Sequence, residues 1–304
     1  MIYQVDNLIS FKGHAGAVYD LDYSYTSSLI ASVSGDGFLM HWDIGKLEGY
    51  NSRIQLPAVA YCFHYLSQIN SYLIGLSSGN IIQVDMTERK EVRSIKLGDS
   101  PVFCIRFISS LNLILAGAGD GKLFFIEVDT LNLVHQLSLG NSKIRAIEID
   151  ESLARIYVAS GDGTCFIIDS KTLLPIREFK ANELACNTIC LSEDKSKLFT
   201  GGRDAMINIY KAETFEKIKS IPAHNYAVYS ILKLSGLGLY ASASRDKTIK
   251  IWDSEFNFRL RLDKENYFGH SASVNTILWN EENKLLLSGS DDRSIIAWKF
   301  SETS

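Results

Sequence analysis

The sequence lacks most of the features that would assign a function from composition alone. No run of five or six like charges occurs among its 304 residues, and the net charge at pH 7 is −4. Because phosphate binding needs a concentrated basic face, nucleic acid is not an expected partner. No apolar run approaches the roughly 20 residues of a membrane span, and the N-terminal residues lack the basic-then-apolar order of a signal peptide. We therefore expect no membrane segment.

Cysteine is scarce as well, and its pattern argues against a disulfide framework. There are five cysteines, an odd number, and no Cys-X-X-Cys pair occurs. We expect these thiols to be small buried hydrophobic residues of a protein in a reducing, cytoplasmic compartment. They are Cys62, Cys104, Cys165, Cys186 and Cys190.

Motifs of cofactor and metal chemistry are also missing. No G-x-G-x-x-G, P-loop or G-x-S-x-G motif occurs. His41, His64 and His135 stand at scattered positions without the spacing of metal ligands. Cys186 and Cys190 lie four residues apart on a predicted strand, too far apart for a tetrahedral pair. We expect no cofactor, no metal and no enzymatic activity.

What the chain does contain is one segment written seven times. Its best-preserved copy is ASASRDKTIKIWD, residues 241–253. Five of the six steps between copies are 42 residues and the last is 46, a regularity that chance does not produce. The seven copies begin at Ala31, Leu73, Leu115, Tyr157, Phe199, Ala241 and Leu287.

Each copy reads as strand, tight turn, strand. The turn falls at the sixth residue, where Asp36-Gly37, Asp120-Gly121 and Asp162-Gly163 supply a strong hairpin signal. After the turn both sets of alternate positions are often apolar, so the strand must be covered on both faces. Two further short strands per unit, such as 18–23 before the turn and 92–97 after it, give four strands in about 40 residues. The sequence predicts an all-β, seven-bladed β-propeller with four antiparallel strands per blade, forming a single domain over residues 1–304.

The two ends of the sequence predict how the ring closes. The last repeat ends at Phe300, two residues after Trp298, so its fourth strand is missing. Residues 8–11 supply a spare strand ahead of the first repeat. We expect the N-terminal strand to complete the last blade.

Trp-Asp and Gly-His pairs, among them Trp252-Asp253 and Gly13-His14, make the chain resemble the WD-repeat family over essentially its whole length. The resemblance implies that a turn Asp bonds a His 22 residues earlier and, through a Ser or Thr four residues earlier, a Trp six residues later. Three repeats carry the complete set, and the four between them are degenerate. The sets are His14, Ser32, Asp36 and Trp42; His224, Ser242, Asp246 and Trp252; and His270, Ser288, Asp292 and Trp298.

Ser, His and Asp together also raise the possibility of a hydrolase triad. Catalysis needs one such set beside an open pocket, whereas this chain repeats the set at identical spacing and adds Trp to it. We therefore interpret the sets as structural hydrogen-bond networks. In the Phe199 repeat, Asp204 and Thr200 remain, and Tyr210 replaces Trp.

The same resemblance implies that partners bind the top face, around the central channel. The favoured positions lie three and five residues after the Gly-His site and just before the turn Asp. Aromatic residues gather in the first three blades and basic residues in the next three, which suggests a peptide with hydrophobic and acidic groups. The candidate residues are Tyr19, Tyr61, Phe103, Lys143, Arg145, Asn187, Arg203, Tyr229, Arg245, Asn275 and Asp291.

Three alternatives to this binding site stay open. The candidate residues could merely solvate the channel mouth or stack on one another. Contacts in a larger assembly could instead run through the blade edges. A propeller enzyme would need carboxylates or histidines on the top face, where the prediction finds only Asp291.

The four extra residues, which fall between Leu262 and His270, could form a binding lip or a cheaply tolerated loop insertion.

Overall fold

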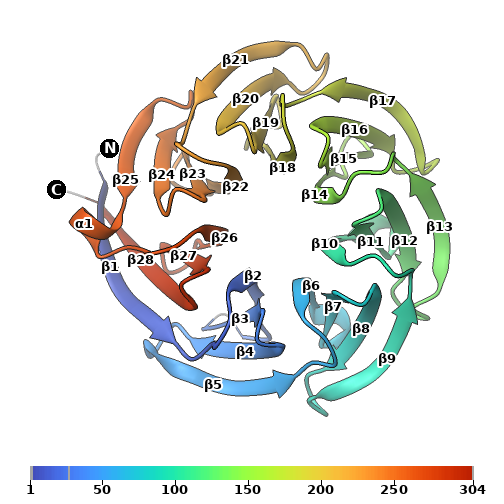
Figure 1. The fold of residues 1–304 in the computed structure, drawn as a ribbon, viewed down its shortest axis with the longest axis horizontal. Coiled ribbons are helices and arrows are strands. Elements are labelled where there is room, and N and C mark those ends of the chain that lie inside the picture. The colour runs from blue at the N-terminus through green and yellow to red at the C-terminus, as the bar shows by residue number, and fades with distance from the viewer. Residues whose placement is uncertain (1–2, 27, 303–304) are drawn as a thin grey trace.

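The computed structural model describes residues 3–26 and 28–302. Within these ranges the strands form seven four-stranded antiparallel sheets, arranged as blades around a ring (Figure 1). The predicted β-propeller is therefore confirmed. No helix in this part of the chain is both long and apolar enough to cross a membrane.

Each blade runs from an inner strand at the channel to an outer strand at the rim (Figure 1). Blades 1 to 3 contain β2 (Val18–Tyr23), β3 (Leu29–Ser34), β4 (Phe38–Asp43) and β5 (Glu48–Gln55); β6 (Ala60–Leu66), β7 (Ser71–Leu76), β8 (Asn80–Asp85) and β9 (Lys90–Lys96); and β10 (Val102–Ile108), β11 (Leu113–Ala118), β12 (Lys122–Glu127) and β13 (Leu133–Ser138). Blades 4 and 5 contain β14 (Ile144–Asp150), β15 (Arg155–Ser160), β16 (Thr164–Asp169) and β17 (Leu174–Lys180); and β18 (Cys186–Leu191), β19 (Lys197–Gly202), β20 (Met206–Lys211) and β21 (Lys217–Pro222). Blades 6 and 7 contain β22 (Val228–Leu234), β23 (Leu239–Ser244), β24 (Ile249–Asp253) and β25 (Phe258–Leu262); and β26 (Val274–Asn280), β27 (Leu285–Ser290), β28 (Ser294–Glu302) and β1 (Tyr3–Lys12). Two 3₁₀ turns, Ser67–Ile69 and Ser109–Leu111, and the one-turn helix α1 (Lys264–Tyr267) complete the described elements.

The core lies between the blades, which is why the middle strands are apolar on both faces. All six residues of β3, β7, β11 and β27 are buried. Glycine lets the next blade approach closely: a Cβ on Gly117 would lie 2.4 Å from Ile144 Cγ2 and 2.6 Å from Cys104 Sγ. The outer strands β9, β17 and β21 are almost wholly exposed.

The ring closes through a strand pair between the two ends of the sequence, as predicted. β1 pairs antiparallel with β28, from Tyr3 opposite Glu302 to Lys12 opposite Ser294. It is longer than the predicted residues 8–11, and its register shifts between Asn7 and Ile9. Phe11 is only 2% exposed and packs between blades 7 and 1.

The extra residues before the last blade form the one-turn helix α1. Asp263 caps the helix by accepting a hydrogen bond from the backbone N–H of Asn266 at 2.8 Å. The Asn7 side chain donates to the carbonyl oxygens of Tyr267 and Phe268 at 3.3 and 3.0 Å. The insertion thus contacts the closing strand at the outer edge of the ring, away from the channel (Figure 1).

Removing residues 1–12 should lower the melting temperature sharply, because blade 7 would lose its outer strand and expose the faces that β1 covers. An unchanged melting curve in circular dichroism would contradict this role.

Point variants test the packing of β1 without shortening the chain. Phe11→Ala should cost about 3–5 kcal/mol of unfolding free energy, the usual cost of truncating a buried Phe. Leu8→Ala is the matched control, because Leu8 lies in the same strand and is 42% exposed.

Candidate partner-binding site

Three blades are held by the same hydrogen-bond chain. In blade 6 the Trp252 indole N–H donates to Ser242 Oγ at 2.8 Å, and Ser242 Oγ lies 2.7 Å from His224 Nε2. His224 Nδ1 lies 2.9 Å from Asp246 Oδ2. A neutral His satisfies every group, since its Nδ1–H donates to the carboxylate and its Nε2 accepts the Ser proton. The equivalent distances in blades 1 and 7 are all 2.7–3.0 Å.

Electrostatics agree with a neutral His beside an ionised Asp. Burial lowers the pKa of His224, although Asp246 opposes the shift. The pKa of Asp246 is lowered: burial would raise it, but the hydrogen bond from His224 and the charge interaction outweigh that effect. Ser32, Ser242 and Ser288 are fully buried, so none of these hydroxyls faces a pocket as a nucleophile would.

Blade 5 carries a modified network that the sequence interpretation missed in part. Asn182 stands 22 residues before Asp204, in the His position, and its amide donates to both carboxylate oxygens at 3.0 and 3.2 Å. The Tyr210 hydroxyl donates to Ala181 O at 2.6 Å rather than to Thr200. The buried Thr200 hydroxyl has no hydrogen-bond partner. The identical spacing of 22 residues was the signal that could have identified Asn182.

A β-bulge marks the innermost strand of every blade. In all seven inner strands the register shifts across one residue, for example between Val18 and Asp20 in β2. A bulge leaves its residue unpaired and re-aims the side chain. The seven bulged residues all line the central channel, and all belong to the predicted candidates: Tyr19, Tyr61, Phe103, Arg145, Asn187, Tyr229 and Asn275.

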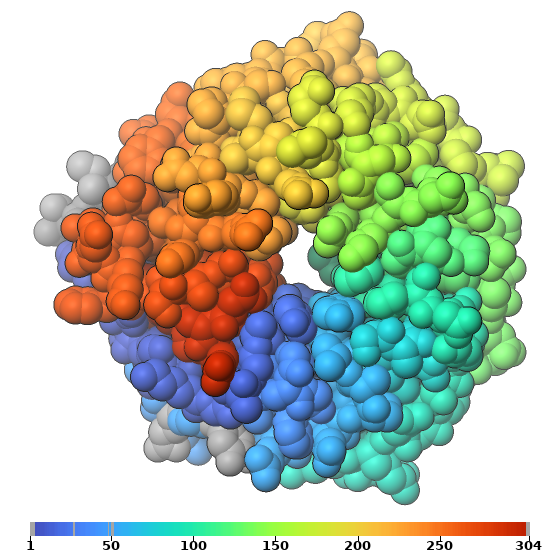
Figure 2. All heavy atoms as spheres, viewed as in Figure 1, coloured from blue at the N-terminus to red at the C-terminus, as the bar shows by residue number. Residues whose placement is uncertain are grey.

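The channel is an open cavity of about 710 Å³ that passes between the seven inner strands (Figure 2). Along β2 the alternate residues Asp20 and Asp22 face it below the bulge. Burial raises the pKa of Asp20 to about 6, against the opposing charge of Arg106. With His64, Arg106 and Glu148 these groups form a charged wall over blades 1 to 4. The sequence interpretation missed this wall because it considered only positions at the mouth.

The aromatic candidates form a continuous arc at the channel mouth. The ring centroids of Tyr19 and Tyr61 are 5.1 Å apart, as are those of Tyr61 and Phe103. All three side chains are half-buried. They contact one another as tilted pairs, close to the mutual stacking that one open alternative proposed, and each still lines the channel.

A cationic arc continues from the last aromatic ring. Lys143 Nζ and the Arg145 guanidinium lie 4.8 and 5.9 Å from the centre of the Phe103 ring. Arg203 and Arg245 follow in blades 5 and 6, each exposed and directly before its turn Asp. The structure therefore brings Lys143 and Arg145 against the aromatic arc of Tyr19, Tyr61 and Phe103.

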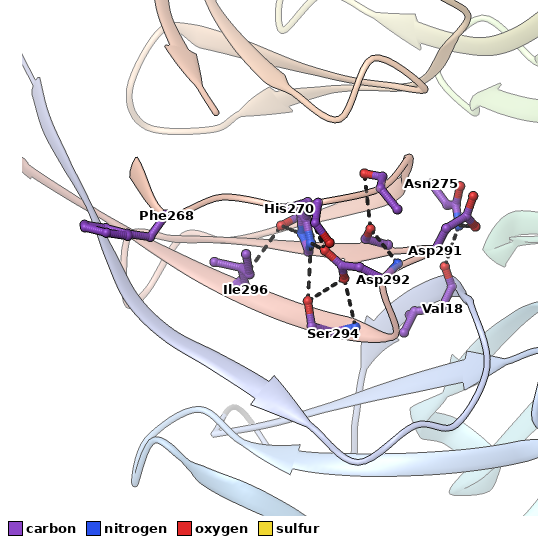
Figure 3. Close-up of polar contacts among 12 residues, drawn as sticks. Val18, Phe268, His270, Asn275, Asp291, Asp292, Ser294 and Ile296 are labelled. Carbon is purple, nitrogen blue, oxygen red and sulfur yellow. Dashed lines mark hydrogen bonds and ion pairs between the residues drawn. The ribbon is translucent and has the colours of Figure 1, made fainter. Parts of the chain in front are cut away.

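The two candidate asparagines make contacts between blades. Asn275 donates to Val18 O at 2.9 Å and to Asp291 Oδ1 at 2.8 Å, at the channel end of blade 7 (Figure 3). Asn187 donates in the same way to Val228 O at 3.0 Å. Their amide groups link blade 5 to blade 6 and blade 7 to blade 1. The recurrence of these sequence positions does not reveal this role.

The described residues contain no group of three or more His, Cys, Asp or Glu side chains arranged to hold a metal ion. Each histidine of the three networks lies within hydrogen-bond distance of its Asp and its Ser, and Thr248 and Ser294 also approach His224 and His270 at 3.4 and 3.3 Å.

The seven-bladed ring and its Trp–Ser–His–Asp networks define a β-propeller of the WD-repeat type. Comparison with known families agrees: the model of the WD domain, G-beta repeat, matches residues 6–43, 215–253 and 263–299, the segments that carry the three complete networks. The chain belongs to the WD-repeat β-propeller family, whose members are typically protein-interaction scaffolds.

A curated relative shows a shorter similarity. The chain is 36% identical over 64 residues to WD repeat-containing protein 91 of Xenopus tropicalis. The match covers 21% of this chain and 8% of that protein.

Ser242→Ala should destabilise the fold because it leaves the Trp252 indole and the His224 imidazole without their shared partner. Orphaned buried groups cost about 1–3 kcal/mol each. Thr200→Val is the control at the same position of blade 5, and it should be neutral or slightly stabilising, since this hydroxyl has no partner. Urea unfolding measures both; equal losses would contradict the network.

Protonation of His14 and His224 should lower the free energy of unfolding below neutral pH. Burial lowers the pKa values of His14 and His224 in the folded protein, so between those values and the unfolded value of about 6.5 the unfolded chain binds more protons. Stability is then lost as the pH falls through this window. Asp20 acts in the opposite sense, because its pKa is raised to about 6.

His224→Asn isolates the histidine contribution, because Asn182 already fills that position in blade 5. The urea midpoint of wild type should fall more between pH 7 and pH 5 than that of the variant. Parallel pH profiles would rule out a titrating role for His224.

Proposed function

We propose that the protein is a non-enzymatic scaffold that binds a protein or peptide partner on its top face, across the mouth of the central channel. The observation that carries the proposal is the set of seven bulges, which aim one side chain per blade into the mouth. A bulge leaves one residue without its backbone partner in the neighbouring strand, and bulges commonly redirect side chains at functional positions.

The chemistry of the mouth supports a partner with hydrophobic and acidic groups. Aromatic and Arg side chains dominate the hot spots of protein interfaces. Here Tyr19, Tyr61 and Phe103 supply half-buried aromatic surface, and Lys143 and Arg145 supply adjacent positive charge. A segment that places an apolar side chain on the arc and an anionic one beside it would match both.

The second candidate is a structural subunit that makes contacts through its blade edges. Each outer strand of blades 2 to 6 leaves large apolar side chains exposed, including Val134 and Ile176 at 55% each and Ile218 at 49%. The same outer strands also carry lysines and arginines, and charged side chains on an open sheet edge prevent unwanted strand pairing. Protection of the edges is a sufficient reason for these charged residues, without a binding role. We therefore rank the top face first.

We also propose a reducing intracellular compartment, because all five cysteines are buried free thiols. Burial raises the pKa of Cys104 to about 12, which keeps the thiol protonated.

A paired set of double variants tests the proposal. Affinity purification from native cells, followed by mass spectrometry, should lose its specific partner with Tyr61→Ala plus Arg245→Glu. Ile176→Ala plus Arg177→Glu is the matched control on the exposed outer strand β17. Loss of the partner only with the β17 variant would favour the blade edges and overturn the top-face proposal.

A further inference from the structure

One turn position recurs through the propeller, with an exception in blade 2. In six blades a hairpin joins the third strand to the fourth, and one residue of its turn has a left-handed backbone with φ between 53° and 62°. Five of these residues are Leu or Phe, whereas blade 2 has Arg89. The five apolar residues are Leu47, Leu131, Leu173, Phe215 and Phe256.

The apolar residues at this position fill the notch between their own blade and the preceding one. Leu131, Phe215 and Phe256 are 4%, 9% and 1% exposed, and each belongs to a hydrophobic cluster shared with the blade before it. The Phe215 ring stacks on Phe179 of the preceding outer strand, with the ring centroids 5.5 Å apart. Burial of the side chain offsets the cost of a left-handed backbone for a residue with a Cβ.

Arg89 leaves the notch between blades 1 and 2 without such a side chain. It lies in the turn between β8 and β9, is exposed, and lines a cavity of about 370 Å³ between these strands and β5 of blade 1. Ile54 of β5, which occupies the register position of Phe179, lines the same cavity together with Ile82 and Val84. We call this cavity the edge notch.

The other junction without such a side chain also has a cavity. Blade 7 has no hairpin at this point, because its outer strand β1 comes from the other end of the sequence. A cavity of about 1250 Å³ lies there, between blades 6 and 7. Its Arg259 already forms an ion pair with Asp253 at 2.8 Å. Both cavities are therefore explained by the missing apolar side chain, but they differ in charge.

The positive charge at the edge notch is not compensated. Among the described residues nine lysines and arginines form ion pairs with Asp or Glu, and Arg53 and Arg89, which both line the notch, are not among them. Lys90 is paired with Glu88 at 2.6 Å, and Glu91 supplies the one carboxylate among the lining residues. Charges on an edge strand can prevent strand pairing, but Arg89 lies in a turn, where that role does not arise.

We propose that the edge notch binds an extended segment of a partner protein that carries a large apolar side chain close to an Asp or Glu. The apolar side chain takes the place that Leu or Phe fills at other junctions, and the carboxylate pairs with Arg89 or Arg53. A guanidinium holds a carboxylate through two parallel hydrogen bonds, and the cavity volume falls in the range of about 300–1,000 Å³ that is usual for ligand pockets. The edge notch lies at the rim, between β5 and the β8–β9 hairpin (Figure 1), so this inference does not depend on the top-face function.

The test measures retention of fluorescent peptides on immobilised full-length protein. Each peptide has one fixed leucine and one fixed glutamate, separated by about one to three residues, within degenerate flanks of Gly, Ser and Thr. Matched pools replace the glutamate by glutamine or the leucine by alanine. We expect the best leucine–glutamate pool to be retained about tenfold more than either matched pool, because each replacement removes a charge-assisted pair or a buried leucine.

Arg89→Leu supplies the side chain that the other hairpins carry. It should reduce retention about tenfold or more, and it should raise the melting temperature by about 2 °C or more because the leucine becomes buried in the notch. Arg89→Gln removes the charge without filling the notch, so it should reduce retention several-fold with an unchanged melting temperature. This second variant keeps the test decisive if Arg89→Leu fails to fold.

Arg177→Gln is the matched control. The Arg177 guanidinium lies 5.1 Å from the centre of the Phe215 ring, at a junction that is already filled, so this variant should leave retention unchanged.

Several results would overturn the inference. Equal retention of the leucine–glutamate and leucine–glutamine pools would remove the charge pairing from it. Retention that Arg89→Leu and Arg89→Gln both leave unaltered would place the peptide elsewhere on the protein. No retention of any pool would reject a partner segment of this chemistry, and so would a dimer in analytical ultracentrifugation that Arg89→Leu abolishes, because a second copy of the chain would then fill the notch.

Discussion

The antiparallel pairing of β1 with β28 is the constraint on which the rest of the structure depends. The middle strands are apolar on both faces, so each blade needs a neighbour on either side. An open ring would leave two blades with an uncovered face. The channel mouth depends on the same closure, because Asn275 of blade 7 donates to Val18 O of blade 1 only when the two blades are adjacent. Closure of the ring therefore both stabilises the fold and shapes the candidate site.

The three complete hydrogen-bond networks lie in blades 6, 7 and 1, which meet at this seam. Blades 2 to 4 solve the same packing problem with apolar groups: in blade 3, Ala116 and Ile126 occupy the Ser and Trp positions, and both are buried. Replacing all partners of a buried network by apolar groups of suitable shape is nearly neutral, whereas removing one partner is costly. In blades 2 to 4 the Ser and Trp positions are thus both apolar, although Asp120 and Asp162 remain in the turns of blades 3 and 4. Blade 5 is intermediate: Asn182 hydrogen-bonds Asp204, whereas the buried Thr200 hydroxyl has no hydrogen-bond partner.

The strict repeat explains why so much of the fold could be predicted from the sequence. A period of 42 residues fixes the number of blades, the turns and the position that recurs at the channel mouth. Contacts between blades could not be predicted, because they join residues whose proximity depends on the twist and stagger of neighbouring sheets. The cross-blade hydrogen bonds of Asn187 and Asn275, the contact of α1 with Asn7, and the buried charge of Asp20 all belong to this group.

The division of the mouth into aromatic and cationic arcs has an energetic consequence. The half-buried Arg145 guanidinium, whose Nε has no hydrogen-bond partner, costs free energy in the folded protein. The blades pack against one another through apolar side chains, and side-chain hydrogen bonds such as that of Asn187 link neighbouring blades. Packing between blades therefore fixes the backbone positions from which the side chains of the mouth project.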